Sequence, residues 1–156
     1  MTAAVALLLD QASKAGARSA LHFGRKIEIL PGLFSLRLAE NPGGAFGALG
    51  SWPPLLILIG LAAILAIVSL RKEGSKSRLF AASLGLLLGG AMGNLIDRIL
   101  FRRVTDFLDF GVTVSGRLVS WPTFNLADVA ITIGVIVLAY HVLVRRDRSQ
   151  ESGARS

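Results

Sequence analysis

The sequence contains no cysteine, and this absence excludes disulfide bonds, thiolate catalysis and cysteine-ligated metal sites. Histidine is scarce: His22 and His141 lie far apart, and no His-x-x-x-His or Glu-plus-His ligand set accompanies them. No glycine-rich phosphate loop follows a predicted strand, and the neighbours Ser13 and Lys14 have poor geometry for a Ser–Lys nucleophile pair. We therefore expect neither a metal nor any other cofactor.

Acidic residues are few, because 10 Asp and Glu stand against 17 Lys and Arg, for a net charge of +7. Such an excess of bases is compatible with nucleic-acid binding. However, the bases lie mainly in short segments between and after long apolar runs, which is the pattern of membrane topology. With 53% hydrophobic residues and a mean hydropathy of +0.61, the 156-residue chain is predicted to be a single-domain integral membrane protein without a nucleic-acid partner.

Four apolar runs predict membrane-spanning helices over residues 3–23, 54–70, 79–100 and 126–144. Pro53 and Pro54 mark the start of the second run. The first run is the weakest, because Asp10, Lys14 and Arg18 interrupt it. These three residues recur every four positions and therefore share one helical face. That face must contact protein, because lipid offers no partner to a charge.

The two long connections carry alternating apolar and polar residues, which predicts short strands. In residues 24–52 the alternation lies in "KIEIL" and "LFSLRLAEN", and the turn-like segment "NPGGAFGALG" follows. Residues 101–124 contain a second pair of candidate strands, "GVTVS" and "RLVSW". The predicted fold class is an all-α membrane protein of four transmembrane helices with small strand segments outside the bilayer.

The positive-inside rule orients the predicted spans. The connection "RKEGSKSR" and the C-terminal segment "RRDRSQESGARS" hold four bases each, whereas each long connection holds three at much lower density. Both termini are therefore predicted to be cytoplasmic, and both long connections to lie on the periplasmic side in a bacterium. We expect no cleavable signal peptide, because the apolar start runs into Asp10 without a basic region. Residues 1–148 are predicted to form one domain, and residues 149–156 a disordered polar tail.

Asp106 and Asp128 are the first candidates for catalysis, because both are predicted to lie near the outer membrane face. Asp106 follows the third predicted span, and Asp128 lies in the first turn of the fourth. Two carboxylates at close range in a partly dry site cannot both ionise easily and can share a proton. One member can then activate a water while the other protonates a carbonyl oxygen. Position alone does not separate Asp106 from Asp109, and one of the two is expected to be a solvated loop carboxylate.

Asn125 and Asp128 also have a structural interpretation. They stand three residues apart at a predicted helix start, so Asn125 fits an N-cap and Asp128 completes a capping-box-like arrangement. Asp128 also complements the helix dipole. Capping and catalysis are compatible, because the dipole favours an ionised carboxylate.

Asn94, Asp97 and Arg98 fall at i, i+3 and i+4, on one helical face. For Asp97 and Arg98, a polar clamp that fixes helix packing is the simpler interpretation, with partners among Lys14, Asp10 and the "ENPGGAFG" segment. The preceding "GLLLGGAMG" has small residues at spacings that allow close helix approach.

The residues alone leave two functions open besides hydrolysis. The first is a small proton-coupled membrane carrier in which Asp10, Asp97 and Asp128 form a relay. The acids cluster near one membrane face, however, and trace no path across the bilayer. The second is a non-catalytic assembly protein whose polar residues only clamp helices together.

Five motifs in order resemble those of the bacterial lipoprotein signal peptidase family, also called signal peptidase II. They are "DQASK" (10–14), "NPGGAFG" (41–47), "GGAMGNLIDR" (89–98), "VTDFLDF" (104–110) and "FNLADVAI" (124–131). Each motif is weak alone, but five in order on four spans are specific. The resemblance implies an aspartic protease of the bacterial inner membrane. Such an enzyme cuts the signal peptide from prolipoproteins, just before a cysteine that carries a diacylglyceryl group, and is inhibited by globomycin.

The resemblance also implies roles for individual residues. Asp106 in "DFLDF" and Asp128 in "NLAD" match the catalytic pair. Positions near the substrate or the dyad are matched by Asn41, Asn94, Arg98 and Asn125, and structural polar positions by Asp10, Lys14 and Asp97. The segment between the first two spans would form a periplasmic β-cradle with an extended loop over the site.

Two departures from the family pattern change what we expect locally. Only nine residues precede Asp10, so we expect either a short first helix or a misassigned start of the chain. Pro42 and Gly44 stand in a motif that more often reads Asn-x-Gly-Ala-Ala-Phe. Pro42 lacks a backbone N–H and Gly44 loosens the chain, so the loop's contact with substrate is expected to differ from that pattern.

Overall fold

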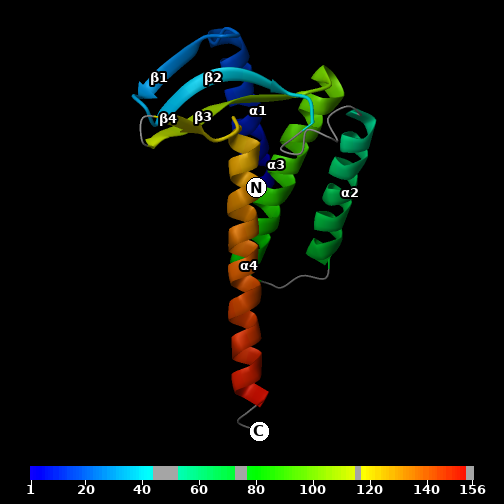
Figure 1. Ribbon diagram of the computed structural model, residues 1–156. Helices are drawn as coiled ribbons and strands as arrows, with labels where there is room; N and C mark the ends of the chain where they lie inside the picture. The colour runs from blue at the N-terminus through cyan, green and yellow to red at the C-terminus, as the bar shows by residue number, and fades with distance from the viewer. Residues whose placement is uncertain (44–52, 73–76, 115–116, 154–156) are drawn as a thin grey trace.

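The computed structural model describes residues 1–43, 53–72, 77–114 and 117–153. The elements in chain order are α1 (Thr2–Ala20), β1 (Lys26–Leu30), β2 (Phe34–Asn41), α2 (Pro53–Lys72), α3 (Arg78–Phe101), β3 (Val104–Val114), β4 (Arg117–Ser120) and α4 (Leu126–Gly153). The helix α3 is central, because it contacts α1, α2 and α4 (Figure 1). An antiparallel sheet of order β1-β2-β3-β4 lies at one end of the helices (Figure 1).

Glycines on α3 let the neighbouring helices approach closely, as the spacing in "GLLLGGAMG" predicts. A Cβ atom added at Gly89 would lie 2.6 Å from the carbonyl oxygen of Ala3 in α1. One added at Gly90 would lie 2.5 Å from the carbonyl oxygen of Ala127 in α4. Both distances are shorter than real Cβ contacts, so the two adjacent glycines place α1 and α4 against the backbone of α3.

The strand β3 begins at Val104, directly after α3. Arg102 ends the helix in a left-handed conformation with φ of 62°. The strand β3 then pairs with β2, with Ala39 opposite Asp106 and Ser35 opposite Asp109. The expected strand pair in residues 101–124 is therefore present, but its first strand starts earlier than the "GVTVS" alternation suggested. Most of residues 104–109 are buried, so this part of the strand shows no two-residue periodicity.

The sheet packs on the end of α1 through a small apolar core. Ala17 and Leu21 from the end of α1 meet Leu38 of β2 and Phe107 of β3 in one buried cluster. The strands are thereby anchored to the helices rather than free in solvent. This contact fixes the position at which β3 crosses the ends of the helices.

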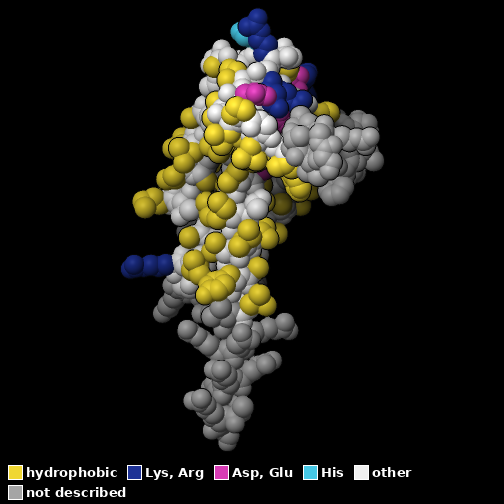
Figure 2. All heavy atoms as spheres, turned by 60° about the vertical axis from the view of Figure 1, so that its left-hand side comes forward, with side chains coloured by type: hydrophobic (Ala, Val, Ile, Leu, Met, Phe, Trp, Pro, Cys, Tyr) yellow, Lys and Arg dark blue, Asp and Glu magenta, His cyan; other side chains and the backbone are white. Residues whose placement is uncertain are grey.

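Two of the predicted spans are long and apolar enough to cross a membrane: α3, over Arg78–Phe101, and the part Leu126–Leu143 of α4. The apolar part of α2, Pro54–Ser69, is shorter. The helix α1 carries Asp10, Lys14 and Arg18, as the sequence shows. Hydrophobic side chains cover the flank of the helical part in Figure 2, whereas acidic and basic ones gather mainly near the sheet end.

The C-terminal ends of α1 and α4 differ from the sequence-based prediction. The helix α1 stops at Ala20, short of residue 23, and Leu21 caps it in an extended conformation. The helix α4 continues to Gly153, so residues 149–153 are helical where a disordered tail was predicted. Glutamine and glutamate in that segment are good helix formers, and a helix already begun extends at little cost. The predicted "NPGGAFGALG" loop lies outside the described residues beyond Gly43.

Candidate active site

Lys14 lies at the centre of a polar cluster between α1 and α3. Its Nζ is 2.9 Å from Asp10 Oδ2, 2.9 Å from Asn94 Oδ1 and 3.4 Å from Asp97 Oδ2. The side chains of Lys14, Asp10 and Asp97 are 0% exposed. A buried ammonium group is stable only where its charge is paired and its three donors meet acceptors, and both conditions hold here. The predicted inward face of α1 is confirmed, and so is Lys14 as a partner of Asp97; its contact with Asn94 was not predicted.

The same cluster holds the starts of two other elements. Asp10 Oδ1 accepts a hydrogen bond from the backbone N–H of Ala127, in the first turn of α4, at 2.9 Å. Asp97 Oδ2 accepts one from the backbone N–H of Thr105, at the start of β3, at 2.9 Å. Both donors would otherwise be buried without a partner. The cluster therefore fixes α4 and β3, the elements that carry the two candidate carboxylates, against α1 and α3.

Asp106 is 2% exposed and projects from β3. Its Oδ2 accepts a hydrogen bond from Asn41 Nδ2 at 3.0 Å, and its Oδ1 accepts one from Asn125 Nδ2 at 2.7 Å. Burial raises the pKa of the Asp106 carboxyl from 3.8 to about 6; the hydrogen bond from Asn41 lowers it, and the negative charge of Asp128 raises it further. Asp106 can therefore hold a proton much closer to neutral pH than an ordinary aspartate.

Asp128 lies in the first turn of α4 and is held from two sides. Its Oδ1 accepts from Asn94 Nδ2 at 2.8 Å, and its Oδ2 accepts from the backbone N–H of Asn125 at 3.3 Å. In return Asn125 Oδ1 accepts from the backbone N–H of Asp128 at 3.0 Å. The predicted capping box is thus confirmed. Asn125 also donates to Asp106, so one asparagine links the two carboxylates.

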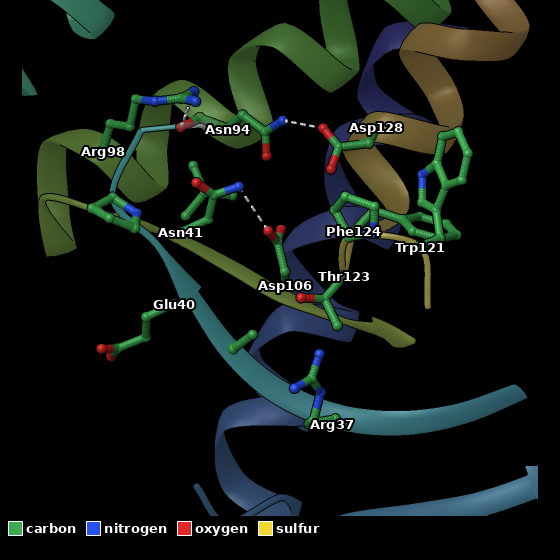
Figure 3. A pocket seen from close by; sticks show the side chains of 14 residues that line it. Arg37, Glu40, Asn41, Asn94, Arg98, Asp106, Trp121, Thr123, Phe124 and Asp128 are labelled. Carbon is green, nitrogen blue, oxygen red and sulfur yellow. Dashed lines mark hydrogen bonds between the residues drawn. The ribbon is translucent and has the colours of Figure 1, made fainter. Parts of the chain in front are cut away.

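Asp106 and Asp128 line one cavity of about 560 Å³. Its lining comes from β2, α3, β3, the segment before α4, and α4 itself: Arg37, Ala39, Glu40, Asn41, Pro42, Asn94, Arg98, Val104, Asp106, Trp121, Pro122, Thr123, Phe124 and Asp128. In Figure 3 the Asn41 side chain points at Asp106, and the Asn94 side chain points at Asp128. Arg98 is anchored by a hydrogen bond from its Nη1 to the carbonyl oxygen of Asn94 at 3.3 Å. All six residues expected near a substrate or dyad therefore lie in or beside one cavity.

Asp109 lies away from this cavity and is not a solvated loop carboxylate, so that expectation is wrong. It is 3% exposed, and Ser35 Oγ donates to its Oδ2 at 3.2 Å. Lys26 Nζ lies 3.4 Å from its Oδ2, and Arg37 Nη2 lies 3.6 Å from its Oδ1. An odd spacing of three along a strand directs Asp106 and Asp109 to opposite faces. The structure thus brings Asp106, not Asp109, to the cavity that Asp128 lines.

Three residues around the site were not singled out from the sequence. Gln11 Nε2 donates to Asp10 Oδ2 and to the carbonyl oxygen of Gly93, at 3.1 Å each, and so adds to the polar cluster. Trp121 and Phe124 form part of the cavity wall. The sequence could have indicated Trp121 and Phe124, because both come just before an apolar span, and aromatic residues are typical of the membrane–water interface.

Known proteins similar to this chain agree with one another. A family model described as signal peptidase (SPase) II matches residues 2–144. The lipoprotein signal peptidase of Burkholderia thailandensis is 41% identical over 145 residues, covering 90% of this chain and 84% of that protein. That of Geobacter metallireducens is 41% identical over 151 residues, covering 94% and 90%.

Solved structures of bacterial membrane enzymes share the fold. One, solved at 2.3 Å, is 28% identical with a TM-score of 0.83, covering 94% of this chain and 88% of that one. Another, solved at 1.9 Å, is 29% identical with a TM-score of 0.80, covering 91% and 90%. This likeness and the apolar helices indicate a membrane location. Motif order, fold and similarity over nearly the whole chain therefore establish that this protein belongs to the signal peptidase II family of lipoprotein-processing peptidases.

Proposed function

We propose that the chain is an aspartic endopeptidase that removes signal peptides from diacylglyceryl-modified prolipoproteins by cleaving before the lipidated cysteine. Family membership supplies the class of reaction, peptide hydrolysis in lipoprotein processing. The observation that carries the aspartic mechanism is the pairing of Asp106 and Asp128 in one cavity, linked through Asn125. No cofactor is required, because the two carboxyl groups supply both the base and the acid.

In the proposed reaction Asp128 is ionised and Asp106 holds the shared proton. Asp128 takes a proton from a water, whose oxygen adds to the scissile carbonyl carbon, while the Asp106 proton moves to the carbonyl oxygen. The C–N bond then breaks as the leaving nitrogen takes the proton from Asp128 and Asp106 regains one from the intermediate. The raised pKa of Asp106 supports this division, since a usable general acid holds its proton near the working pH.

Asn41, Asn94, Arg98 and Asn125 are proposed to bind substrate or support the dyad. Asn41 and Arg98 line the wall of the cavity beside the carboxylates, where amide and guanidinium donors can meet a peptide's carbonyl groups (Figure 3). Asn94 and Asn125 each donate to a carboxylate, so they orient the dyad. Asp10, Lys14 and Asp97 hold the supporting cluster.

The proposed setting is the bacterial inner membrane, crossed by α1, α2, α3 and α4 as four spans of one domain over residues 1–148. The cavity lies at the sheet end of α3 and α4, and that end is proposed to face the periplasm. The acyl chains of the substrate would remain in the bilayer while the peptide enters the cavity. Lipid anchoring then orients the scissile bond before the reaction, which can lower the barrier by several kcal/mol.

Purified protein in detergent is expected to cleave a prolipoprotein peptide with a diacylglyceryl-cysteine, at the bond before that cysteine. The same peptide with an unmodified cysteine should be cleaved at least about 100-fold more slowly, because the anchor no longer positions it. Mass spectrometry of the products gives the bond, and globomycin should block the reaction. Equal cleavage of both peptides, or none of either, would refute the proposed specificity.

The proposed topology is testable because the chain has no cysteine of its own. Ser120→Cys in β4 should react with a membrane-impermeant maleimide added to spheroplasts, whose outer membrane is opened and whose inner membrane is intact. Ser75→Cys in the basic connection should react only after the inner membrane is opened. Labelling of both positions from the same side would contradict four spans with cytoplasmic termini.

The carrier alternative gains no support from the described residues. A relay through Asp10 and Asp97 needs acids that can take up and release protons. Instead both carboxylates contact Lys14 and accept hydrogen bonds from backbone N–H groups. These contacts already occupy the carboxylate oxygens, which suits a scaffold better than a relay.

A further inference from the structure

We propose that Lys14 is a positioning residue for the dyad: it sets the orientation of the Asn94 side-chain amide and thereby holds the Asp128 carboxylate in its working orientation. This inference rests on the proposed aspartic mechanism. Within the described part of the chain, the Lys14 ammonium group bonds to Asp10, Asn94 and Asp97 and to neither carboxylate of the dyad, and it is fully buried beneath the cavity. Its effect on the Asp128 carboxylate would pass through Asn94.

The ammonium group decides which atom of the Asn94 amide faces it. Lysine has three donors and no acceptor, so the Asn94 atom 2.9 Å from Nζ must be the oxygen. Asn125 Nδ2 donates to the same oxygen at 3.2 Å. The orientation of Asn125 is itself fixed, because its own Oδ1 accepts the backbone N–H of Asp128. Two independent donors therefore hold the Asn94 oxygen on the inner side.

With its oxygen held inward, Asn94 presents its NH₂ group to Asp128. The Nδ2 atom lies 2.8 Å from Asp128 Oδ1, a contact drawn in Figure 3. A cation on the amide oxygen polarises the amide and makes its N–H a stronger donor, an effect that low local dielectric enhances. If the amide turned over, its oxygen would face the Asp128 carboxylate and the two would repel.

Lys14 reaches the two carboxylates by different routes: it reaches Asp128 through the Asn94 amide, whereas it acts on Asp106 through its positive charge, which lowers the pKa of that carboxyl. Asp128 accepts from Asn94, whereas the donors to Asp106 are Asn41 and Asn125. The chain of contacts from Lys14 thus makes the two carboxylates unequal. That inequality matches the division of roles in the proposed mechanism, with the ionised base on α4 and the proton carrier on β3.

A purely structural role for Lys14 is the competing explanation, because Lys14 also neutralises buried carboxylates. Asp10 faces it from α1 and Asp97 from α3, and Arg18 Nη1 lies 3.9 Å from Asp97. From α4 the cluster receives the Ala127 N–H, which Asp10 accepts. A test must therefore remove the ammonium group without leaving an unbalanced buried charge.

The double variant Lys14→Met/Asp10→Asn meets that need, because it removes one positive and one negative charge together. The asparagine introduced at position 10 keeps a side-chain oxygen for the Ala127 N–H, and Asp97 keeps Arg18. Against the Asp10→Asn reference, we expect kcat on the lipidated peptide to fall at least about tenfold while KM changes less than about threefold. The same replacement made with Asn94→Ala present should lower kcat by no more than about twofold, since the group through which Lys14 acts on Asp128 is already gone.

Two results would overturn the inference. One is a kcat kept within about twofold of the reference when Lys14 is replaced, even if the melting temperature drops. The other is an equal loss of kcat with Asn94 present and absent. If Lys14→Met/Asp10→Asn does not fold, Lys14→Gln is measured in its place, in the Asp10→Asn reference with and without Asn94→Ala. Its neutral amide can accept as well as donate and so no longer dictates the Asn94 orientation. Asp106→Asn and Asp128→Asn are assayed in parallel, because activity in those variants would instead refute the dyad itself.

Discussion

Asp106→Asn and Asp128→Asn are each expected to reduce the cleavage rate of a diacylglyceryl-cysteine peptide by about 10²–10⁴-fold or more. An amide at position 128 cannot accept the proton of the attacking water. An amide at position 106 cannot deliver a proton to the carbonyl oxygen without a large cost. Steady-state kinetics on purified, folded variants measures the loss, which should fall mainly on kcat.

Asp109→Asn is the matched control for Asp106→Asn. Both carboxylates are buried on β3, but Asp109 does not line the cavity and pairs with Lys26 and with Arg37, which itself lies at the cavity wall. The control should lose some thermal stability, because its ion pairs are lost, and keep turnover within about threefold, because Asp109 itself does not line the cavity. Near-normal turnover in either dyad variant, or a loss in the Asp109 control as deep as theirs, would remove the assignment.

The difference in stability between Asp106→Asn and the unmodified chain should depend on pH. A cooperative unfolding transition shows that the variant is folded, and the pH dependence of the difference checks the pKa of Asp106. The folded-state pKa of Asp106, about 6, lies above its unfolded value of 3.8. Its contribution to stability is therefore fully present below about pH 3.8 and is lost as pH rises through about 6. The unmodified chain should be most stable relative to the variant at or below about pH 4. It should lose up to about 3 kcal/mol of that difference by about pH 7, as measured by unfolding in detergent.

Gly90→Ala is expected to destabilise the protein by about 1–3 kcal/mol and to lower kcat at least about tenfold. The new methyl group would stand 2.5 Å from the carbonyl oxygen of Ala127, a backbone atom that cannot turn aside. The start of α4 must then move away from α3. Asp128 follows Ala127 directly, so its hydrogen bond from Asn94 would stretch. Thermal unfolding and steady-state kinetics measure the two effects.

Gly16→Ala provides the comparison for Gly90→Ala. Gly16 lies on the exposed side of α1, and a Cβ there would meet nothing within 4 Å. The substitution should stabilise the protein by about 0.5–1 kcal/mol, because alanine loses less backbone freedom than glycine in a helix, and should leave turnover unchanged. If Gly90→Ala behaves as Gly16→Ala does, the close approach of α3 and α4 is not what places Asp128.

The local sequence by itself determined the helices, the first two strands, the inward face of α1 and the capping box at Asn125 and Asp128. Each depends on spacing within one segment: four residues between Asp10 and Lys14, three between Asn125 and Asp128. Such patterns arise from the geometry of a single helix or strand, so they are readable without a partner. The order of the five motifs along the chain also indicated the family without knowledge of the fold.

Spacing alone left open whether Asp106 or Asp109 joins Asp128; the family resemblance implied Asp106, and the tertiary structure gives the physical reason, as it also gives the contacts of Lys14. Asp106 and Asp109 look alike in the sequence; the pairing of β3 with β2 puts them on opposite faces and sends one into the cavity. Lys14 and Asn94 are 80 positions apart, and Asp10 and Ala127 are 117 apart. Contacts of that range form because α1, α3 and α4 pack backbone to backbone at Gly89 and Gly90. No periodicity within one segment records where another segment will lie.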